Sequence, residues 1–306
     1  NFYMPIFEEA LDAYGLPLEL RYLPIIESAL NPSAVSRAGA SGLWQFMIGT
    51  GKIYGLESNS LVDERRDPIK ATWAAARYLK EMYDIYGDWN LVIAAYNCGP
   101  GTINKAIRRA NGETDYWKIY NYLPKETRGY VPAFIAANYV MTYYCDHNIC
   151  PMETNIPAST DTVQVNKNLH FEQIADLCNV PLDQIKSLNP QYKKQMIPGD
   201  SKPYTLRLPI DAISTFIDKQ DTIYTHRADE LFRNRKTVAV KDITPATRKT
   251  TSAVAGKGNL TYYTIKSGDT LSTIARKYGV TIKDIQRWNG MSSTKIAAGK
   301  RLKIYK

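Results

Sequence analysis

The sequence reads Leu23-Pro24-Ile25-Ile26-Glu27-Ser28 and, after a short intervening stretch, Gly42-Leu43-Trp44-Gln45-Phe46-Met47. Glu27 ends an apolar run, where a carboxylate is costly to ionise. Desolvation raises the pKa of such a carboxyl from about 4.3 toward neutrality, and a group that keeps its proton there is suited to general acid catalysis. The glycine-flanked second stretch supplies an amide and an aromatic ring, groups that hold sugars. Together the two stretches predict glycosidic-bond chemistry.

The first half of the chain has the periodicity of α-helices. Asp67 and Pro68 form an N-cap followed by proline at the first helical position, and apolar residues then recur at helical spacing until Gly87. A short apolar helix is expected at 91–96 and another from 132 to 144. Strand-like alternation is almost absent before residue 150, so we expect a mainly α domain over residues 1–155.

The second half contains a duplicated module. Residues 163–199 match residues 263–299 in their core positions, and Asn189 aligns with Asn289. Each copy has the order strand, helix, helix, strand, which predicts two small α+β modules, at 160–210 and 259–306. Residues 211–258 between them are expected to be helical at first and then a flexible basic linker.

Length and hydropathy limit the class of protein. A chain of 306 residues with an apolar fraction of 44% fits two or three globular domains. No window reaches the ~18 uncharged apolar residues of a membrane span. No charged-then-apolar leader opens the sequence, so membrane attachment is expected only through an anchor upstream of residue 1.

The net charge of +9 is divided unevenly along the chain. Residues 1–155 hold 14 Lys/Arg and 17 Asp/Glu, a balance of −3, whereas residues 156–306 hold 25 and 13, a balance of +12. The basic half is expected to contact a polyanion. Zinc-finger spacing, RNA-binding aromatic motifs and basic helices are missing, which argues against nucleic acid, whereas an anionic cell-wall polymer fits the charge.

Cysteine and histidine usage predicts neither a disulfide framework nor a metal site. Four cysteines are too few for such a framework, although Cys145 and Cys150 could pair if a turn lies between them. Cys98 and Cys178 fit small buried apolar positions. The three histidines lack metal-ligand spacing, so no metal and no cofactor is expected.

Glu27 alone does not distinguish a catalyst from a salt-bridge partner of Arg21. The motifs that follow Glu27 make this distinction. In the content and order of these motifs, the first half of the chain resembles the SLT family of lytic transglycosylases, which is related to goose-type lysozyme. The resemblance covers roughly residues 16–150 and implies a lysozyme-like α fold. Cys98 departs from the family's usual alanine but is still small. The matching motifs are Glu27-Ser28, Gly42-Leu43-Trp44-Gln45, Ala95-Tyr96-Asn97 and Glu126-Thr127-Arg128-Gly129-Tyr130.

The resemblance implies that Glu27 cleaves the β-1,4 bond between N-acetylmuramic acid and N-acetylglucosamine in peptidoglycan. Most glycosidases use two carboxylates, but only Glu27 has a suitably apolar setting here. In the family one glutamate acts first as acid toward the leaving sugar and then as base toward the muramic acid 6-hydroxyl, which closes a 1,6-anhydro ring. Intramolecular attack has a high effective molarity. A hydrolytic muramidase and a non-catalytic wall-binding protein remain alternatives.

The resemblance also implies contacts with the substrate. Ser28 and Gln45 are expected to hydrogen-bond the N-acetyl group or sugar hydroxyls, and Asn97 an acetamido group. Met47 is expected to give an apolar contact in the groove. Trp44 fits either a sugar-stacking ring or a core position.

Two tyrosines and a second glutamate complete the implied site. Tyr96 and Tyr130 are expected to orient the catalytic glutamate or the reacting sugar through their hydroxyls. Glu126 is expected to bind a hydroxyl or the peptide stem. Its alternative is a salt bridge to Lys125 or Arg128 in a solvated turn.

The repeated module resembles LysM, a wall-binding module. Gly268, Asp269 and Thr270 of the second copy match its opening loop, which implies a shallow groove for N-acetylglucosamine chains. Asn168-Leu169-His170 replaces that loop in the first copy, although the core positions persist. We therefore expect the second copy to bind glycan and the first to be mainly a structural spacer, with a fold-only domain as the alternative for either.

Together these features predict a monomeric peptidoglycan lytic transglycosylase. An SLT domain followed by LysM modules resembles the membrane-bound lytic murein transglycosylase D-like family. The expected location is the cell envelope, on its periplasmic face. The LysM modules are expected to raise the local concentration of glycan strands at the catalytic groove by tethering.

Overall fold

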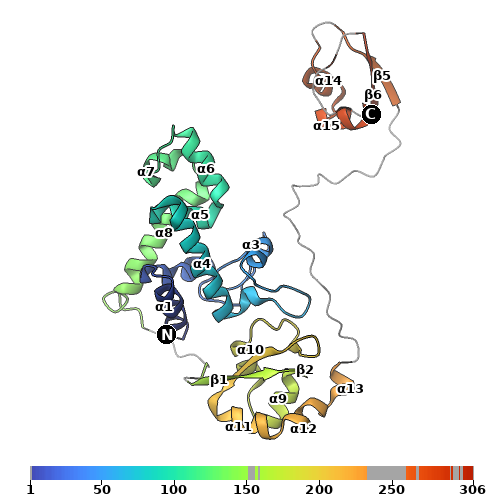
Figure 1. Cartoon of the computed structure of the whole chain (residues 1–306). Helices are drawn as coiled ribbons and strands as arrows, with labels where there is room; N and C mark the ends of the chain where they lie inside the picture. The colour runs from blue at the N-terminus through green and yellow to red at the C-terminus, as the bar shows by residue number, and fades with distance from the viewer. Residues whose placement is uncertain are drawn as a thin grey trace. The chain divides into compact units, whose positions relative to one another are not determined.

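A computed structural model describes residues 2–150, 156–157, 159–232, 260–266, 269–289, 291, 296 and 299–305. The chain forms two compact units, residues 1–244 and 245–306 (Figure 1). The first unit contains a helical domain and the first copy of the repeat, and the second contains the other copy.

The helical domain packs around α5, whose central residues are all apolar. Five consecutive residues of α5, 91 to 95, are buried, as expected for a helix enclosed by others. Helices α4, α6 and α8 pack against it. The elements in chain order are α1 (Met4–Ala13), η1 (Leu18–Tyr22), α2 (Leu23–Ser28), α3 (Ile48–Ile53), η2 (Glu64–Arg66), α4 (Pro68–Tyr86), α5 (Trp89–Cys98), α6 (Pro100–Arg109), α7 (Tyr116–Ile119), η3 (Tyr120–Tyr122) and α8 (Lys125–Thr142).

Local signals account for the ends of α4. The Asp67 side chain accepts hydrogen bonds from the backbone N–H groups of Ile69 and Lys70, which have no partner within the helix. Gly87, at a φ of 61°, adopts the left-handed conformation that ends the helix. The predicted boundaries of this helix are confirmed.

The expected start of α8 at residue 132 is wrong, because the helix begins at Lys125 and contains Pro132. Proline has no N–H, so the carbonyl of Arg128, four residues earlier, loses its helical donor. The Tyr116 hydroxyl supplies the missing hydrogen bond, with its oxygen 3.0 Å from Arg128 O. A tertiary contact thus allows the helix to continue through the proline.

The first copy of the repeat pairs its strands in two antiparallel sheets. β1 pairs with β4, so that Val165 lies opposite Tyr204, and β2 pairs with β3. Two helices after β4, α11 and α12, cover the same core. The elements are β1 (Thr160–Val165), β2 (Asn168–His170), α9 (Phe171–Cys178), α10 (Leu182–Leu188), β3 (Met196–Pro198), β4 (Tyr204–Pro209), α11 (Ile210–Asp218), α12 (Gln220–Thr225) and α13 (Ala228–Leu231).

The second copy is built in the same way. β5 (Leu260–Thr264) pairs antiparallel with β6 (Arg301–Tyr305), and α14 (Leu271–Tyr278) and α15 (Ile282–Asn289) complete the module. Asn289 donates to the carbonyls of Ile285 and Lys303 and accepts from Lys303 N–H. Asn189 makes the same three hydrogen bonds in the first copy. The expected fold class, a mainly α domain with small α+β modules, is confirmed.

Two further findings concern cysteines and membranes. Cys145 and Cys150 are exposed free thiols, so the disulfide left open above is not formed, and Cys98 and Cys178 are free as well. In the part of the chain that the structure describes, no helix combines the length and apolar character needed to cross a membrane.

Candidate active site

Glu27 stands at the end of the short helix α2. The helix ends because Ala29 and Leu30 adopt left-handed backbone conformations, with φ angles of 50° and 60°. The Ser28 hydroxyl lies 2.9 Å from Pro24 O within the helix and 3.0 Å from Leu43 O. The second contact attaches the end of α2 to the loop at residues 42–47, so the stretches 23–28 and 42–47 meet in the fold.

A tyrosine from α8, which packs against α2, contacts Glu27. Tyr130, on α8, donates its hydroxyl hydrogen to Glu27 Oε1. Arg21, the salt-bridge partner considered above, instead donates to Glu8 Oε1 at 2.6 Å. No described group hydrogen-bonds Glu27 Oε2, so the two carboxyl oxygens differ in their surroundings.

Burial raises the pKa of Glu27, and it is the largest of three influences. The hydrogen bond from Tyr130 stabilises the carboxylate and lowers the pKa, whereas the negative charge of Glu126 raises it. The balance favours the protonated acid at a higher pH than for a solvated glutamate. This is the property that a general acid requires.

The negative charge of Glu27 affects the pKa of Tyr96. Burial and that charge, in this order, raise the pKa of Tyr96 well above its ordinary value. Its hydroxyl donates to Trp44 O at 2.7 Å. Trp44 itself is fully buried, with Nε1 2.9 Å from Thr72 Oγ1, so it occupies the core and does not present a ring for a sugar.

The loop at residues 42–47 contains two residues with positive φ angles, Gly42 and Gln45. Gly42 has a φ of 89°, and a Cβ there would lie 1.8 Å from Arg65 O. Gln45 adopts a φ of 48°, and its Nε2 donates to Gly42 O at 2.8 Å and Ala34 O at 3.3 Å. Its Oε1 remains as an acceptor. Met47, half-buried, precedes α3 as its N-cap.

Helices α5 and α8 are joined beside the site. Asn97 Oδ1 accepts a hydrogen bond from Thr127 Oγ1 at 2.8 Å, a partner that sequence reasoning missed although it stands inside the Glu-Thr-x-x-Tyr motif. Glu126 is exposed in the first turn of α8 and forms no salt bridge within the described residues; Arg128 Nε donates to Leu123 O.

Residues 4–119 match the family model of the transglycosylase SLT domain. The chain carries an SLT domain. Residues 159–225 match the LysM-like domain of lytic transglycosylase MltD, and residues 263–304 match the LysM domain. The SLT match includes Glu27 and Tyr96 but ends before α8, so the helix that brings Tyr130 lies outside it.

Comparison with named proteins and solved structures gives further similarities. The chain is 33% identical over 294 residues to membrane-bound lytic murein transglycosylase D of Escherichia coli K12, covering 95% of this chain and 60% of that protein's length. It is 33% identical over 124 residues to the soluble lytic murein transglycosylase of the same strain, covering 39% and 19%. The solved structure of the 70 kDa soluble lytic transglycosylase of E. coli matches with 29% identity and a TM-score of 0.40, covering 46% of this chain and 24% of that one.

Asp269 and Thr270, two of the three predicted LysM residues, lie directly before α14 in the second unit. Asp269 Oδ2 accepts hydrogen bonds from the Lys266 backbone N–H and the Tyr263 hydroxyl, both at 2.8 Å, and these contacts lower the pKa of Asp269. Thr270 and Thr273 exchange hydrogen bonds that cap α14. Gly268 lies outside the described residues.

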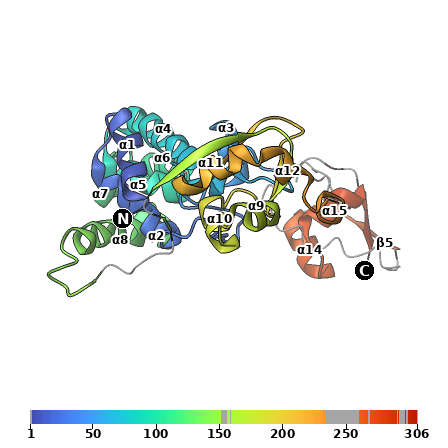
Figure 2. The ribbon, with the colours of Figure 1, turned by 90° about the horizontal axis from the view of Figure 1, so that it is seen from below.

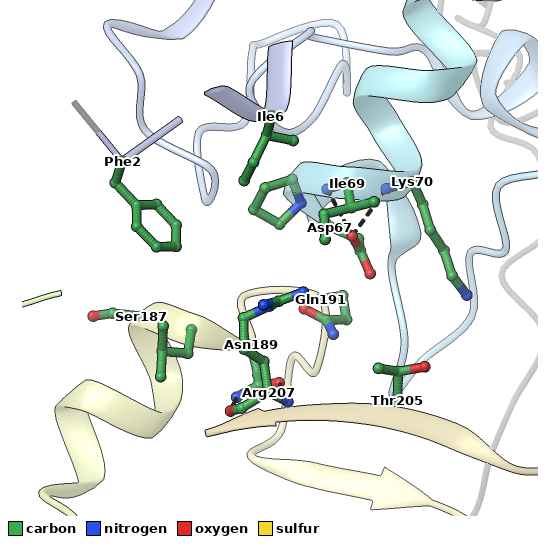
Figure 3. A pocket seen from close by; sticks show the side chains of 12 residues that line it. Phe2, Ile6, Asp67, Ile69, Lys70, Ser187, Asn189, Gln191, Thr205 and Arg207 are labelled. Carbon is green, nitrogen blue, oxygen red and sulfur yellow. Dashed lines mark hydrogen bonds between the residues drawn. The ribbon is translucent and has the colours of Figure 1, made fainter. Parts of the chain in front are cut away.

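A separate cavity of about 130 Å³ lies in the first unit, between the SLT domain and the first LysM-like module (Figure 3). Asp67 and Lys70 from the start of α4 face Asn189 and Gln191 of the module across it. It contains none of the residues predicted to bind substrate. The cavity therefore marks the boundary between the two domains.

Proposed function

We propose that this chain is a peptidoglycan lytic transglycosylase, which cleaves the N-acetylmuramic acid-β-1,4-N-acetylglucosamine bond and leaves 1,6-anhydro ends. The observation that carries the proposal is Glu27: burial raises its pKa, Tyr130 holds Oε1, and Oε2 is left for a ligand. The SLT match and the names of the relatives support the same reaction.

The reaction needs only one carboxyl group. Protonated Oε2 of Glu27 gives its hydrogen to the glycosidic oxygen, the bond from that oxygen to the anomeric carbon breaks, and the electron pair leaves with N-acetylglucosamine. The carboxylate then removes the hydrogen of the muramic acid 6-hydroxyl, whose oxygen bonds to the anomeric carbon. Glu27 regains its proton and no water is consumed. The Tyr130 hydrogen bond stabilises the carboxylate between the two steps.

Neighbouring polar groups are proposed to hold the sugars. Gln45 retains a carbonyl acceptor and Asn97 an amide donor, because their other atoms are already bonded within the protein. A donor and an acceptor together suit an acetamido group. Ser28 has given its hydrogen to backbone carbonyls, so it is proposed to accept from a hydroxyl. Met47 adds an apolar contact.

The remaining assignments concern the whole protein. The second LysM module, through the loop at Gly268, Asp269 and Thr270, is proposed to bind glycan strands and to keep the enzyme on the wall. We place the chain in the cell envelope, on its periplasmic face, as a monomer. A membrane-bound relative supports this location.

Product analysis tests the proposal. Purified peptidoglycan is digested with the chain, and the products are weighed by mass spectrometry. Transglycosylation predicts muropeptides lighter by one water with anhydromuramic ends, whereas reducing ends alone would indicate a hydrolytic muramidase. Glu27→Gln is expected to lose cleavage and to keep wall pull-down. The matched control is Glu113→Gln, on an exposed salt bridge with Lys118, which is expected to cleave normally.

A further inference from the structure

One segment, residues 57–66, belongs to the SLT domain by sequence but is anchored in the first LysM-like module. Leu61 and Val62 are buried in the core of that module. Val62 bridges Tyr192, the Asp63 N–H donates to Gln191 O at 2.9 Å, and the Lys193 N–H donates to Leu61 O at 2.8 Å. The first part of the segment is therefore held against the module by an isolated antiparallel bridge and its two flanking backbone hydrogen bonds. In both ribbon views the module lies against the helical domain (Figures 1 and 2).

The second part of the segment binds both ends of residues 39–46, which we call the active-site loop and which include most of the loop at residues 42–47. Arg65 is 5% exposed and binds the Asp63 carboxylate through Nε and Nη2, both at 2.8 Å. Its Nη1 donates to Gly39 O at 2.8 Å and to Phe46 O at 2.9 Å, the two ends of the loop that contains Gln45. The planar guanidinium can make these contacts together because its donors point in fixed directions.

The loop that Arg65 holds touches the neighbours of Glu27. Leu43 O accepts the Ser28 hydroxyl, and Trp44 O accepts the Tyr96 hydroxyl. Its backbone includes a non-glycine residue with positive φ, a conformation that persists only where surrounding contacts impose it. A continuous series of contacts thus joins the module to the surroundings of Glu27.

We propose that Arg65 is a positioning residue for catalysis, and that the first LysM-like module acts through it to hold residues 39–46 in the productive conformation. The module is then a required part of the catalytic unit, beyond the spacer role expected from its sequence. The inference rests on the proposed function, because cleavage of glycan strands is one of its two measurements.

The first variant is Arg65→Lys, which keeps the charge and loses the planar set of donors. We expect kcat to fall about tenfold, because small displacements of catalytic groups have large effects on rate. Amide hydrogen exchange in residues 39–46 is expected to become faster. Val62→Ala, which loosens the docking of the module, is expected to change both measurements in the same direction. It also tests the proposal if Arg65→Lys does not fold.

The matched control is Lys202→Ala. Lys202 pairs with Glu57 at 2.7 Å across the same domain boundary, but the side chain is 53% exposed and does not contact the loop. Both measurements are expected to stay unchanged, as for most exposed ion pairs. Folded Arg65→Lys or Val62→Ala protein with normal kcat, or with normal exchange in residues 39–46, would overturn the proposal.

Failure of this inference is distinguishable from failure of the proposed function. Amide hydrogen exchange in residues 39–46 is measured without substrate. It therefore reports how strongly Arg65 stabilises these residues, independently of the reaction that the enzyme catalyses. Glu27→Gln is expected to abolish cleavage and to leave that exchange unchanged. A variant that melts at lower temperature but cleaves normally below its transition would reduce Arg65 to a purely structural residue.

Discussion

Tyr130 and Glu27, 103 positions apart in the chain, share a hydrogen bond in which the tyrosine hydroxyl donates to one carboxyl oxygen. The contact makes the two oxygens of the carboxyl unequal. Oε1 accepts the tyrosine hydrogen, whereas no described group hydrogen-bonds Oε2, and in the proposed reaction the proton of the neutral acid is on Oε2. The same contact opposes the effect of burial on the pKa of Glu27, which ties the geometry of the site to its pH dependence.

Tyr130→Phe is expected to shift the pH profile of cleavage upward. Burial raises the pKa of Glu27 and the tyrosine hydrogen bond lowers it, so removing the hydroxyl raises the pKa further. In the proposed reaction Glu27 must be protonated at the start, so the alkaline limb of kcat against pH is expected to move to higher pH. The maximal kcat is expected to fall as well, because the carboxylate formed in the first step loses its donor. An unchanged alkaline limb would contradict the assignment of that limb to Glu27.

Glu126→Gln is expected to shift the same limb in the opposite direction. The negative charge of Glu126 disfavours ionisation of Glu27, so its removal lowers the pKa of Glu27 and moves the alkaline limb to lower pH. Glu126 is exposed, and its effect is expected to fade as salt rises toward 1 M, where the screening length is about 3 Å. Measuring the limb at low and high salt checks this, and Glu113→Gln is the control.

Tyr116→Phe is expected to destabilise the helical domain through α8. The Tyr116 side chain is buried and its hydroxyl bonds the Arg128 carbonyl that Pro132 leaves without a helical donor. A fully buried carbonyl without a partner costs about 1–3 kcal/mol of unfolding free energy, and the partly buried Arg128 carbonyl is expected to cost less than the upper value. Chemical denaturation measures the loss. Tyr122→Phe, at a side chain 45% exposed, is the control, and equal stabilities for the two variants would contradict this account of the helix.

Comparing Gly42→Ala with Gly39→Ala separates the cost of a positive φ angle from the cost of a steric clash with a neighbouring backbone atom. Both glycines have φ near 90°, so both substitutions impose the conformational penalty of a side chain there, roughly 1 kcal/mol. Only at Gly42 would the new Cβ meet a backbone atom, Arg65 O at 1.8 Å, whereas nothing lies within 4 Å at Gly39. We expect Gly42→Ala to lose cleavage and much of its stability and Gly39→Ala to keep most of both. Activity and thermal unfolding of the pair provide the measurement.

Sequence reasoning succeeded where the determining interactions are local. The cap at Asp67 and the stop at Gly87 predict α4, and the recurrence of apolar positions with Asn189 and Asn289 predicts the duplicated module. It failed at Pro132, where the local rule against proline inside a helix is met by a hydroxyl from α7. It also passed over Arg65 and Thr127, whose partners lie elsewhere in the chain.

By itself the sequence determined the mainly helical first half, the repeated α+β modules and the candidacy of Glu27, because periodicity, capping residues and an ordered set of motifs are all properties of neighbouring positions. Only the tertiary structure decided which oxygen of Glu27 is held, which groups set its pKa, and that the first LysM-like module reaches the active-site loop through Arg65. These depend on distances between residues far apart in the chain, and such distances arise only when the helices and the module pack together.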